Sequence, residues 1–394
     1  MTVAIHPINR LVGVAAAPLI LGGLLAGCGS PSSSLRTTGT STVSTPSSSP
    51  GPTSSAATPT AAPTPIAGFQ VASVTFVSAQ DGWVLGTATC SSGSCLAIAR
   101  TQDGGSTWTS VGPPPTSFET EGASTGVSGI RFANQQDGWV YGGQLWATRD
   151  GGTTWTEVAL AGLSSTGENP AIQALETSAG QVQAVYFGSS GFRIATSSVA
   201  GNSWSVSATG VAFGAGPVPA AQLVVQGAAG WAVENDRVAT GGARLQAGAW
   251  VAWTPPCSTV EGPATLAASS SQNLIAVCDD GLWGGGSPTE RAYASTNGGA
   301  SFSQLAAPLP SACQGAALAS PSSSVAATGC GAGIEATFNG GSTWTSVFSG
   351  SGAITYLGFT TSSQGVAVDA GSGSNLGSLL MTKDGGHTWV PVTV

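Results

Sequence analysis

Apolar and polar residues alternate over short stretches that are separated by polar turns. The first repeat shows the pattern most plainly: residues 71–76 alternate, residues 81–86 begin the second stretch, and residues 96–100 and 107–111 form the third and fourth. An alternation with a period of two predicts β-strands with one face buried, because successive side chains of a strand point to opposite sides. These four stretches therefore predict four consecutive strands.

The same four-strand pattern recurs about every 45 residues, giving seven repeats in all. The six later repeats span residues 128–158, 171–206, 221–253, 264–305, 316–348 and 354–392. A repeat of this length predicts an all-β fold, a seven-bladed β-propeller of four-stranded antiparallel blades. Each repeat begins with an inner strand and ends with an outer one. We expect the first blade to pack against the seventh; alternatively, residues 66–70 add an outer strand to the last blade.

A polar turn precedes the last strand of each repeat. Its four clear copies, with the pattern Thr-x-Asp/Asn-Gly-Gly-x-Thr-Trp, occupy residues 101–108, 148–155, 337–344 and 382–389, and weaker copies end at Trp204, at Trp250 or Trp253, and at Phe302. The acidic side chain can accept backbone hydrogen bonds within its turn, the glycines permit positive φ, and the aromatic ring can fill the space between blades. We expect structural roles for Asp103, Trp108, Asp150, Trp155, Asn339, Trp344, Asp384 and Trp389.

The turn pattern resembles the Asp-box, or BNR repeat, of sialidases, sortilin-type receptors and many bacterial propellers. The Asp-Gly-Trp elements that begin at Asp81 and Asp137 narrow this resemblance. Together the motifs resemble the photosystem II assembly and stability factor family over nearly all of residues 66–394. In the resembling families the turn lies at the blade periphery, away from the central pocket. The resemblance therefore implies the fold and is nearly silent on function.

The N-terminal region has the features of a bacterial lipoprotein signal. An apolar run at residues 11–25 follows Arg10 and ends in Leu25-Ala26-Gly27-Cys28. The run is shorter than a membrane-spanning helix, and its end resembles a lipobox. We expect cleavage of residues 1–27 and lipidation of Cys28. A core helix with a chance cysteine is the alternative.

Residues 29–65 are almost wholly Ser, Thr, Pro, Gly and Ala. Such a composition buries too little apolar surface to offset the entropy of ordering the chain. We therefore expect three parts: a signal peptide (1–27), a lipidated cysteine with a disordered tether (28–65), and the propeller (66–394).

The charge balance excludes one class of partner. The chain has 10 basic and 18 acidic residues, a net charge of −8, and loss of Arg10 with the signal makes the mature chain still more acidic. Nucleic-acid binding normally requires a basic surface, so we do not expect that partner.

Six cysteines remain after Cys28 is assigned to lipid, and an even number in an exported protein favours disulfides. Cys90 and Cys95 flank a four-residue tip in the first repeat. The other four hold matching places in two successive repeats, which favours the pairs Cys257–Cys278 and Cys313–Cys330. Buried free thiols are the alternative.

Residues suited to catalysis are few. A sialidase needs three converging arginines, an acid and a tyrosine nucleophile with a glutamate partner. The arginines Arg100, Arg149 and Arg193 are expected on third strands, far from the axis, and none of the tyrosines Tyr141, Tyr186, Tyr293 and Tyr356 stands in a recognisable catalytic setting. His387 lies in a turn. Asp279-Asp280 could donate oxygen ligands to Ca²⁺, and the alternative is that the pair belongs to a solvated loop. We expect no cofactor, metal or catalytic residue.

These observations favour a monomeric, membrane-anchored binding or assembly scaffold on the outer face of the membrane in a bacterial cell envelope. The ligand would be a protein or glycan held on one ring face, and the insertions 113–126 and 281–291 are candidate contributors. A sialidase-like glycoside hydrolase acting on extracellular glycans is the alternative. A structural envelope protein without a specific ligand is the third possibility.

Overall fold

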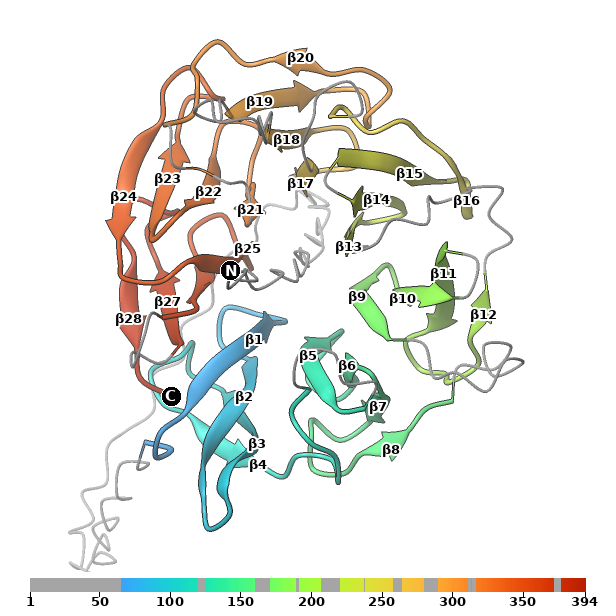
Figure 1. The fold of residues 1–394 in the computed structure, drawn as a ribbon, viewed down its shortest axis with the longest axis vertical. Helices are drawn as coiled ribbons and strands as arrows, with labels where there is room; N and C mark the ends of the chain where they lie inside the picture. The colour runs from blue at the N-terminus through green and yellow to red at the C-terminus, as the bar shows by residue number, and fades with distance from the viewer. Residues whose placement is uncertain are drawn as a thin grey trace, which may run out of the picture. The chain divides into compact units, whose positions relative to one another are not determined.

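Seven four-stranded antiparallel sheets surround a central axis in the computed structural model of the chain (Figure 1). Each sheet consists of four consecutive strands, which confirms the seven-bladed propeller. Helices do not occur in the described residues. The structure describes residues 65–119, 125–159, 171–188, 191–206, 220–236, 238–257, 264–279, 290–310, 313, 317–371 and 377–394.

The first four blades coincide with the first four repeats. Blade 1 contains β1 (Gln70–Phe76), β2 (Gly82–Cys90), β3 (Gly93–Thr101) and β4 (Thr109–Val111). Blade 2 contains β5 (Val127–Phe132), β6 (Gly138–Gly142), β7 (Leu145–Thr148) and β8 (Thr156–Glu157). Blade 3 contains β9 (Ile172–Ser178), β10 (Gln181–Gly188), β11 (Gly191–Ser198) and β12 (Ser205–Val206). Blade 4 contains β13 (Ala220–Gln226), β14 (Ala229–Asp236), β15 (Val238–Gln246) and β16 (Ala249–Ala252).

The last three blades follow the same order. Blade 5 contains β17 (Ala264–Ala268), β18 (Leu274–Asp279), β19 (Glu290–Ser295) and β20 (Ser303–Gln304). Blade 6 contains β21 (Leu318–Ala319), β22 (Ala326–Cys330), β23 (Gly333–Thr337) and β24 (Thr345–Ser349). Blade 7 contains β25 (Ile354–Phe359), β26 (Gly365–Asp369), β27 (Ser378–Thr382) and β28 (Val390–Val392).

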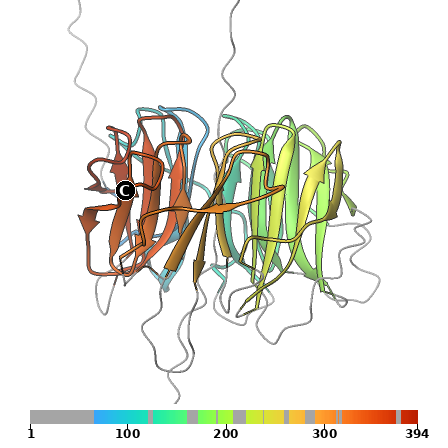
Figure 2. The same ribbon diagram turned by 90° about the horizontal axis from the view of Figure 1, so that it is seen from above.

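The first strand of every blade lies nearest the axis and the fourth lies at the periphery (Figure 1). Figure 2 shows the strands from the side, running between the two ends of the ring. Because the strands are antiparallel, the connections between first and second strands and between third and fourth strands share one end, which we call the turn face. The hairpins between second and third strands and the links between blades share the other end, the connection face.

The core consists of seven clusters that lie mainly between neighbouring blades. The aromatic residue that ends each turn packs toward the preceding blade: Trp108 of blade 1 contacts the cluster that contains Leu379 and Met381 of blade 7. Trp389 of blade 7 likewise packs with Ile334 of blade 6. These contacts explain the expected wedge role, because a large ring removes the most apolar surface from water at the widening gap between two sheets.

The structure distinguishes the two candidates in blade 4. Trp250 is buried and packs with Ile194 and Phe192 of the preceding blade, so it occupies the wedge position. Trp253 points the other way: its indole N–H donates to the carbonyl of Gly299 in blade 5 at 2.8 Å.

Ring closure follows the first of the two expectations. Blades 1 and 7 share one apolar cluster, which contains Val74, Phe76, Tyr356 and Val368. The alternative, a further strand from residues 66–70, is not formed, since the last sheet has four strands. A single backbone hydrogen bond from Ile66 N–H to the carbonyl of Val394, 3.2 Å, ties this segment to the chain end.

Three disulfides are present, with the pairings expected from the sequence. Cys90–Cys95 joins β2 to β3 near their hairpin, and both strands extend further toward this tip than the predicted 81–86 and 96–100. Cys257–Cys278 and Cys313–Cys330 each join the segment that enters a blade to its second strand. The topology places all three bonds toward the connection face.

Candidate functional site

The inner strands expose a backbone edge toward the axis, and polar side chains of neighbouring blades bind it. Ser73 and Thr75 of β1 accept hydrogen bonds from the backbone N–H groups of Ile130 (3.2 Å) and Phe132 (3.4 Å) on β5. Such bonds matter because a buried backbone N–H or carbonyl without a partner costs free energy. The buried hydroxyls near the axis are therefore part of the fold.

Gln222 on β13 makes the most complete contact of this kind. Its side-chain amide donates to the carbonyl of Leu266 at 2.8 Å and accepts from the N–H of the same residue at 2.7 Å. One glutamine thus satisfies both backbone groups of a residue on the next inner strand. The sequence signal for these residues is a polar position inside an otherwise apolar inner strand.

Arg131 on β5 is the centre of a buried charged cluster. Its guanidinium lies 2.8 Å from the Glu176 carboxylate on β9, and its Nε donates to the carbonyl of Leu175 at 3.3 Å. The two charged side chains are 1% and 0% exposed. Tyr356 of β25 also hydrogen-bonds Arg131. Since blade 1 lies between blades 7 and 2, this contact connects blades that are not neighbours in the ring.

The electrostatics of the cluster follow from its burial. Burial lowers the pKa of Arg131, but the Glu176 carboxylate outweighs it, and the pKa lies above its ordinary value. Burial raises the pKa of Tyr141 and of Tyr356. Tyr141 packs so closely on Gly129 that a Cβ at that glycine would lie 2.3 Å from the ring. The structure therefore holds Arg131 as a cation, Glu176 as its counter-ion and both phenols neutral at physiological pH.

The other described arginines stand away from this cluster. Arg100, Arg193, Arg244 and Arg291 lie on third strands, and Arg149 lies one residue beyond one. Arg131 is thus the one arginine on an inner strand in the described part of the chain. The sequence reasoning assigned no role to Arg131, although an arginine inside the apolar stretch 127–132 marks its position. The described arginines do not form the three-arginine centre that a sialidase needs.

The polar turns form a self-contained hydrogen-bond network. In the first copy, Asp103 Oδ1 accepts from the Thr107 N–H and the Thr101 hydroxyl, both at 2.8 Å. The Thr101 hydroxyl accepts from the Gly105 N–H at 2.9 Å, and Gly104 and Gly105 have φ of 70° and 85°, values that favour glycine. The other clear copies, built on Asp150, Asn339 and Asp384, have the same bonds. These residues serve the turn itself.

Two of the acidic groups differ in what dominates their pKa. The Thr388 hydroxyl lowers the pKa of Asp384 to about 2. Burial raises the pKa of Asp103, but hydrogen bonds from Thr107 and Thr101 outweigh it and the net shift is downward. Both carboxylates are therefore charged across the physiological range.

Blade 5 has the same turn although its sequence is degenerate. Asn297 Oδ1 accepts from the Ser301 N–H at 2.9 Å, and the Ser295 hydroxyl accepts from the Gly299 N–H at 2.9 Å. Serine and asparagine thus replace threonine and aspartate, because either pair supplies the same acceptors. The weak copy that ends at Phe302 is a complete turn.

A second contact joins the turns of blades 2, 3 and 5 to the blade before each of them. Trp83 on β2 donates its indole N–H to the carbonyl of Gly151 in the turn of blade 2, 3.0 Å away. Arg100, its cross-strand neighbour, lies over the Trp83 ring at 4.8 Å, and Asp81 pairs with Arg100 at 3.7 Å. The ring stacks on Phe132 with centroids 3.8 Å apart. We call this arrangement the brace.

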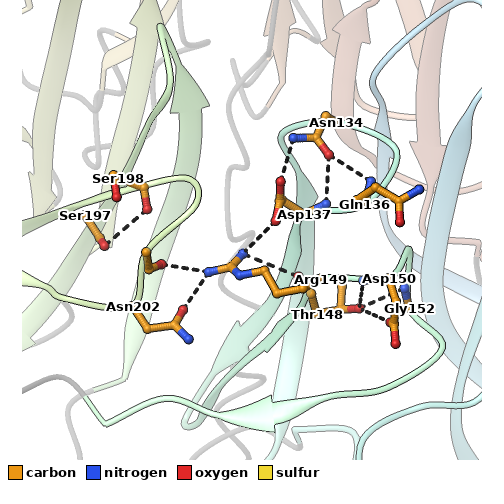
Figure 3. A network of polar contacts seen from close by, with 11 residues as sticks. Asn134, Gln136, Asp137, Thr148, Arg149, Asp150, Gly152, Ser197, Ser198 and Asn202 are labelled. Atoms are coloured by element: carbon orange, nitrogen blue, oxygen red, sulfur yellow. Dashed lines mark hydrogen bonds and ion pairs between the residues drawn. The ribbon is translucent and has the colours of Figure 1, made fainter.

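Figure 3 shows the corresponding network between blades 2 and 3, where Arg149 lies between Asp137 and Asn202. Its guanidinium donates to the Asn202 side chain at 2.6 Å and to the Gly201 carbonyl at 2.7 Å. The Asp-Gly-Trp elements therefore connect neighbouring blades on the turn face, in agreement with a structural role for Asp81 and Asp137.

Blade 4 also has a brace, which sequence reasoning missed. Trp231 and its cross-strand neighbour Arg244 both donate to the carbonyl of Gly298, at 3.1 and 3.2 Å. The signal that could have identified it is the pair Gly230-Trp231, which matches Gly82-Trp83 without the preceding aspartate.

Several expectations fall on residues outside the described ranges. These are the signal sequence, Cys28, the tether, Asp280, residues 120–124 of the insertion 113–126 and most of the insertion 281–291. In the described part, no group of three or more His, Cys, Asp or Glu side chains is placed to hold a metal ion. The described residues also include no helix that is long and apolar enough to cross a membrane.

Comparison with known proteins supports the resemblance. The family model for the photosynthesis system II assembly factor YCF48 matches residues 62–245. A structure of YCF48 bound to a D1 peptide has 16% sequence identity and a TM-score of 0.52, and the match covers 80% of this chain and 94% of that one. YCF48 from Cyanidioschyzon merolae gives 15% identity and a TM-score of 0.53, with 81% and 96% covered.

Propellers of other function share the fold. The GH74 xyloglucanase from Xanthomonas campestris has 15% identity and a TM-score of 0.50, with 82% of this chain and 60% of that chain covered. At such identities a structural likeness shows the fold alone. A search among curated proteins finds no significant match. The matched segment, the seven blades and the recurring turns together show that the chain is similar to photosystem II assembly factor-like BNR propellers.

Proposed function

We propose that the protein is a lipid-anchored scaffold that binds a protein partner on the outer face of a bacterial membrane. The lipobox that ends at Cys28 supports the anchor. The low-complexity segment 29–65 would connect that anchor to the ring and allow the ring to stand clear of the membrane surface.

The observation that supports a binding role is that the polar residues near the axis hold the blades together, which leaves the two faces of the ring for binding. Arg131, Glu176 and Gln222 are buried and bonded to neighbouring inner strands, so their chemistry holds the blades together. The ring is thereby a rigid frame, and the faces remain for recognition. Loops on a rigid scaffold are where binding residues usually occur.

The similarity to YCF48 supports a protein as the ligand. The YCF48 propeller has been seen with a D1 peptide bound, and that finding applies to YCF48. For this chain we carry over only the class of ligand, a segment of a protein. The photosystem partner itself is not carried over, since a lipobox protein need not come from a photosynthetic cell.

Affinity capture of the full chain from detergent-solubilised membranes tests this proposal. Reproducible enrichment of one membrane protein, absent from a capture with an unrelated lipoprotein, is the expected result. A protein that enriches no partner above that control would be a structural envelope component without a specific ligand, and the scaffold proposal would be rejected.

A glycoside hydrolase remains the second candidate because of one observation. Arg131, Glu176 and Tyr356 gather at the axis, and these are residue types that a sialidase uses. Their burial argues against substrate access. Glu335 lies on β23, the third strand of blade 6, and serves as a control away from the axis. Hydrolysis of fluorogenic glycosides by the purified chain, abolished in Glu176→Gln but retained in Glu335→Gln, would establish catalysis in place of the scaffold role.

A further inference from the structure

A small cavity lies between blades 5 and 6 on the turn face. Its volume is about 60 Å³, and it is partly open to solvent. Its walls include Ile275 of β18, Ala294 of β19, Ser320 at the end of β21 and the turn residue Gly340. These residues come from the same positions that form the brace between blades 1 and 2.

The strand register establishes this correspondence. Trp83 and Ile275 are each the second residue of a second strand, and their cross-strand neighbours are Arg100 and Ala294. Arg100 and Ala294 also directly precede the first residue of their turns. The positions that tryptophan and arginine occupy in blade 1 are therefore occupied by isoleucine and alanine in blade 5.

The facing blade has small side chains at the same place. In blade 2, Phe132 pairs with Gly138, the first residue of β6. In blade 6, the residue at the corresponding position, opposite Ala326 at the start of β22, is Ser320. Gln135, which donates to Asp81 at 2.7 Å, corresponds by the same offset to Ser323. Small residues on both sides therefore leave the space that a brace fills elsewhere.

The acceptors of the brace remain in place. Gly340 occupies the turn position of Gly151, whose carbonyl accepts from Trp83, and of Gly298, whose carbonyl accepts from Trp231 and Arg244. None of the described residues donates a hydrogen bond to the Gly340 carbonyl.

Asn273 retains the second acceptor. It directly precedes the second strand of blade 5, as Asp81 does in blade 1. The backbone N–H of each residue donates to the hydroxyl of a serine three positions earlier, Ser270 or Ser78, at 2.9 Å. The Nδ2 of Asn273 donates to Ser270, which leaves Oδ1 without a donor among the described residues. The cavity therefore offers two oxygen acceptors and lacks the cation that Asp81 binds.

Size and charge select among possible occupants. An engineered apolar cavity of about 150 Å³ binds benzene, so a site of less than half that volume is too small to enclose an indole ring. A guanidinium group is smaller, planar and rich in N–H donors, and its aliphatic stem can lie along Ile275. The chain carries a net charge of −8, which favours a basic partner.

We propose that this cavity binds an arginine side chain of the protein partner, which would complete from outside the brace that Arg100 and Arg244 complete from within. The guanidinium donates to the Gly340 carbonyl and to Asn273 Oδ1, in place of the missing residue at Ala294. This inference rests on the proposed scaffold function and names one subsite of it.

The test titrates the full chain with Nα-acetylarginine methylamide, and with the lysine and norleucine counterparts as controls. The amide signal of Gly340 and the side-chain amide of Asn273 report binding by NMR. We expect the arginine compound to bind about tenfold more tightly than the lysine compound, the equivalent of one further charge-assisted hydrogen bond. We expect no saturable change with norleucine.

Two variants separate the cavity from other sites. Ala294→Arg supplies the guanidinium from the chain itself, so it should abolish the response. Thr196→Arg is the matched control, because Thr196 directly precedes the turn of blade 3 and faces a different gap. Asn273→Asp restores the carboxylate of Asp81 and should tighten arginine binding about fivefold.

Equal shifts with arginine and lysine, arginine shifts that persist in Ala294→Arg, or no response at Gly340 would each overturn the proposal. Asn273→Asp keeps the inference testable if Ala294→Arg fails to fold. The titration needs no partner, so its failure is distinct from failure of the scaffold role, which membrane capture reads. A captured partner that binds Ala294→Arg as well as the native chain would support the scaffold and reject this subsite.

Discussion

The guanidinium of Arg131 and the carboxylate of Glu176 lie 2.8 Å apart, although 45 positions separate them in the chain. The pair joins the inner strands of blades 2 and 3, and both side chains are shielded from water. A buried ion pair is costly to break, because removing one partner leaves the other charge buried without compensation. It therefore links the stability of two blades.

Replacing Arg131 by alanine should reduce the free energy of unfolding by about 3–5 kcal/mol, the range for a broken buried pair. Denaturant unfolding followed by tryptophan fluorescence measures this loss. Arg100→Ala is the control: that ion pair is longer and more exposed, so its loss should cost about 1 kcal/mol or less. Equal losses in the two variants would contradict the structural role of Arg131.

The brace can be tested with a matched pair of tryptophans. Trp83 and Trp139 are both fully buried, but Trp83 donates to Gly151 whereas the indole N–H of Trp139 has no partner among the described residues. Trp83→Phe should therefore destabilise the chain by about 1 kcal/mol more than Trp139→Phe, the net value of one hydrogen bond. Thermal or denaturant unfolding of both variants gives the difference, and indistinguishable losses would refute it.

Acid stability should depend on the polar turns. The folded-state pKa of Asp384 is about 2, below its ordinary 3.8, because Thr388 hydrogen-bonds the charged form. Its contribution to stability is thus fully present above pH 3.8 and is lost as the pH falls toward 2. Asp384→Asn should lower the free energy of unfolding at neutral pH only slightly, since asparagine forms the same turn at Asn339. It should also make the free energy of unfolding depend less steeply on pH between pH 5 and pH 2, because the titrating carboxylate is gone.

Unfolding titrations at several values between pH 2 and pH 5 measure that slope. Thr388→Val removes the hydroxyl donor and should bring the pKa of Asp384 back toward its ordinary value. An unchanged acid limb in both variants would show that the turn does not contribute to the acid response.

The disulfides should contribute according to the chain length that each closes. Cys257 and Cys278 are 21 positions apart, and the chain-entropy relation gives about 3 kcal/mol for a loop of this length. Cys90 and Cys95 are 5 positions apart and should contribute about 2 kcal/mol. Serine replacement of each pair, followed by unfolding without reductant, measures both. A larger loss for the short loop would contradict this order.

Lipidation of Cys28 is tested by Cys28→Ser in the full chain. The native protein should incorporate an alkyne-labelled fatty acid and partition into a detergent phase, and the variant should do neither. Cys90→Ser, which alters an unrelated cysteine, should label like the native chain. Labelling of Cys28→Ser would reject the anchor.

The sequence by itself determined the number of blades and the architecture of the turns. Both depend on contacts within a few residues: the Asp103 carboxylate reaches Thr107, four positions away, and the same bonds recur in each clear copy. Local hydrogen bonds of this kind leave a recognisable pattern, because a few residue types with the same acceptors satisfy them at a fixed offset. The disulfide pairing could also be predicted from the sequence, since the matching positions of the cysteines in successive repeats limit the possible pairs.

Only the tertiary structure decided which residues meet between blades. Trp83 finds Gly151 across 68 positions, Arg131 finds Glu176, and Trp250 rather than Trp253 fills the wedge of blade 4. The empty place at Ala294 is also visible only when blades 5 and 6 stand side by side. These contacts depend on the rotation of each sheet against the next as the ring closes, and no local pattern of residues records that rotation.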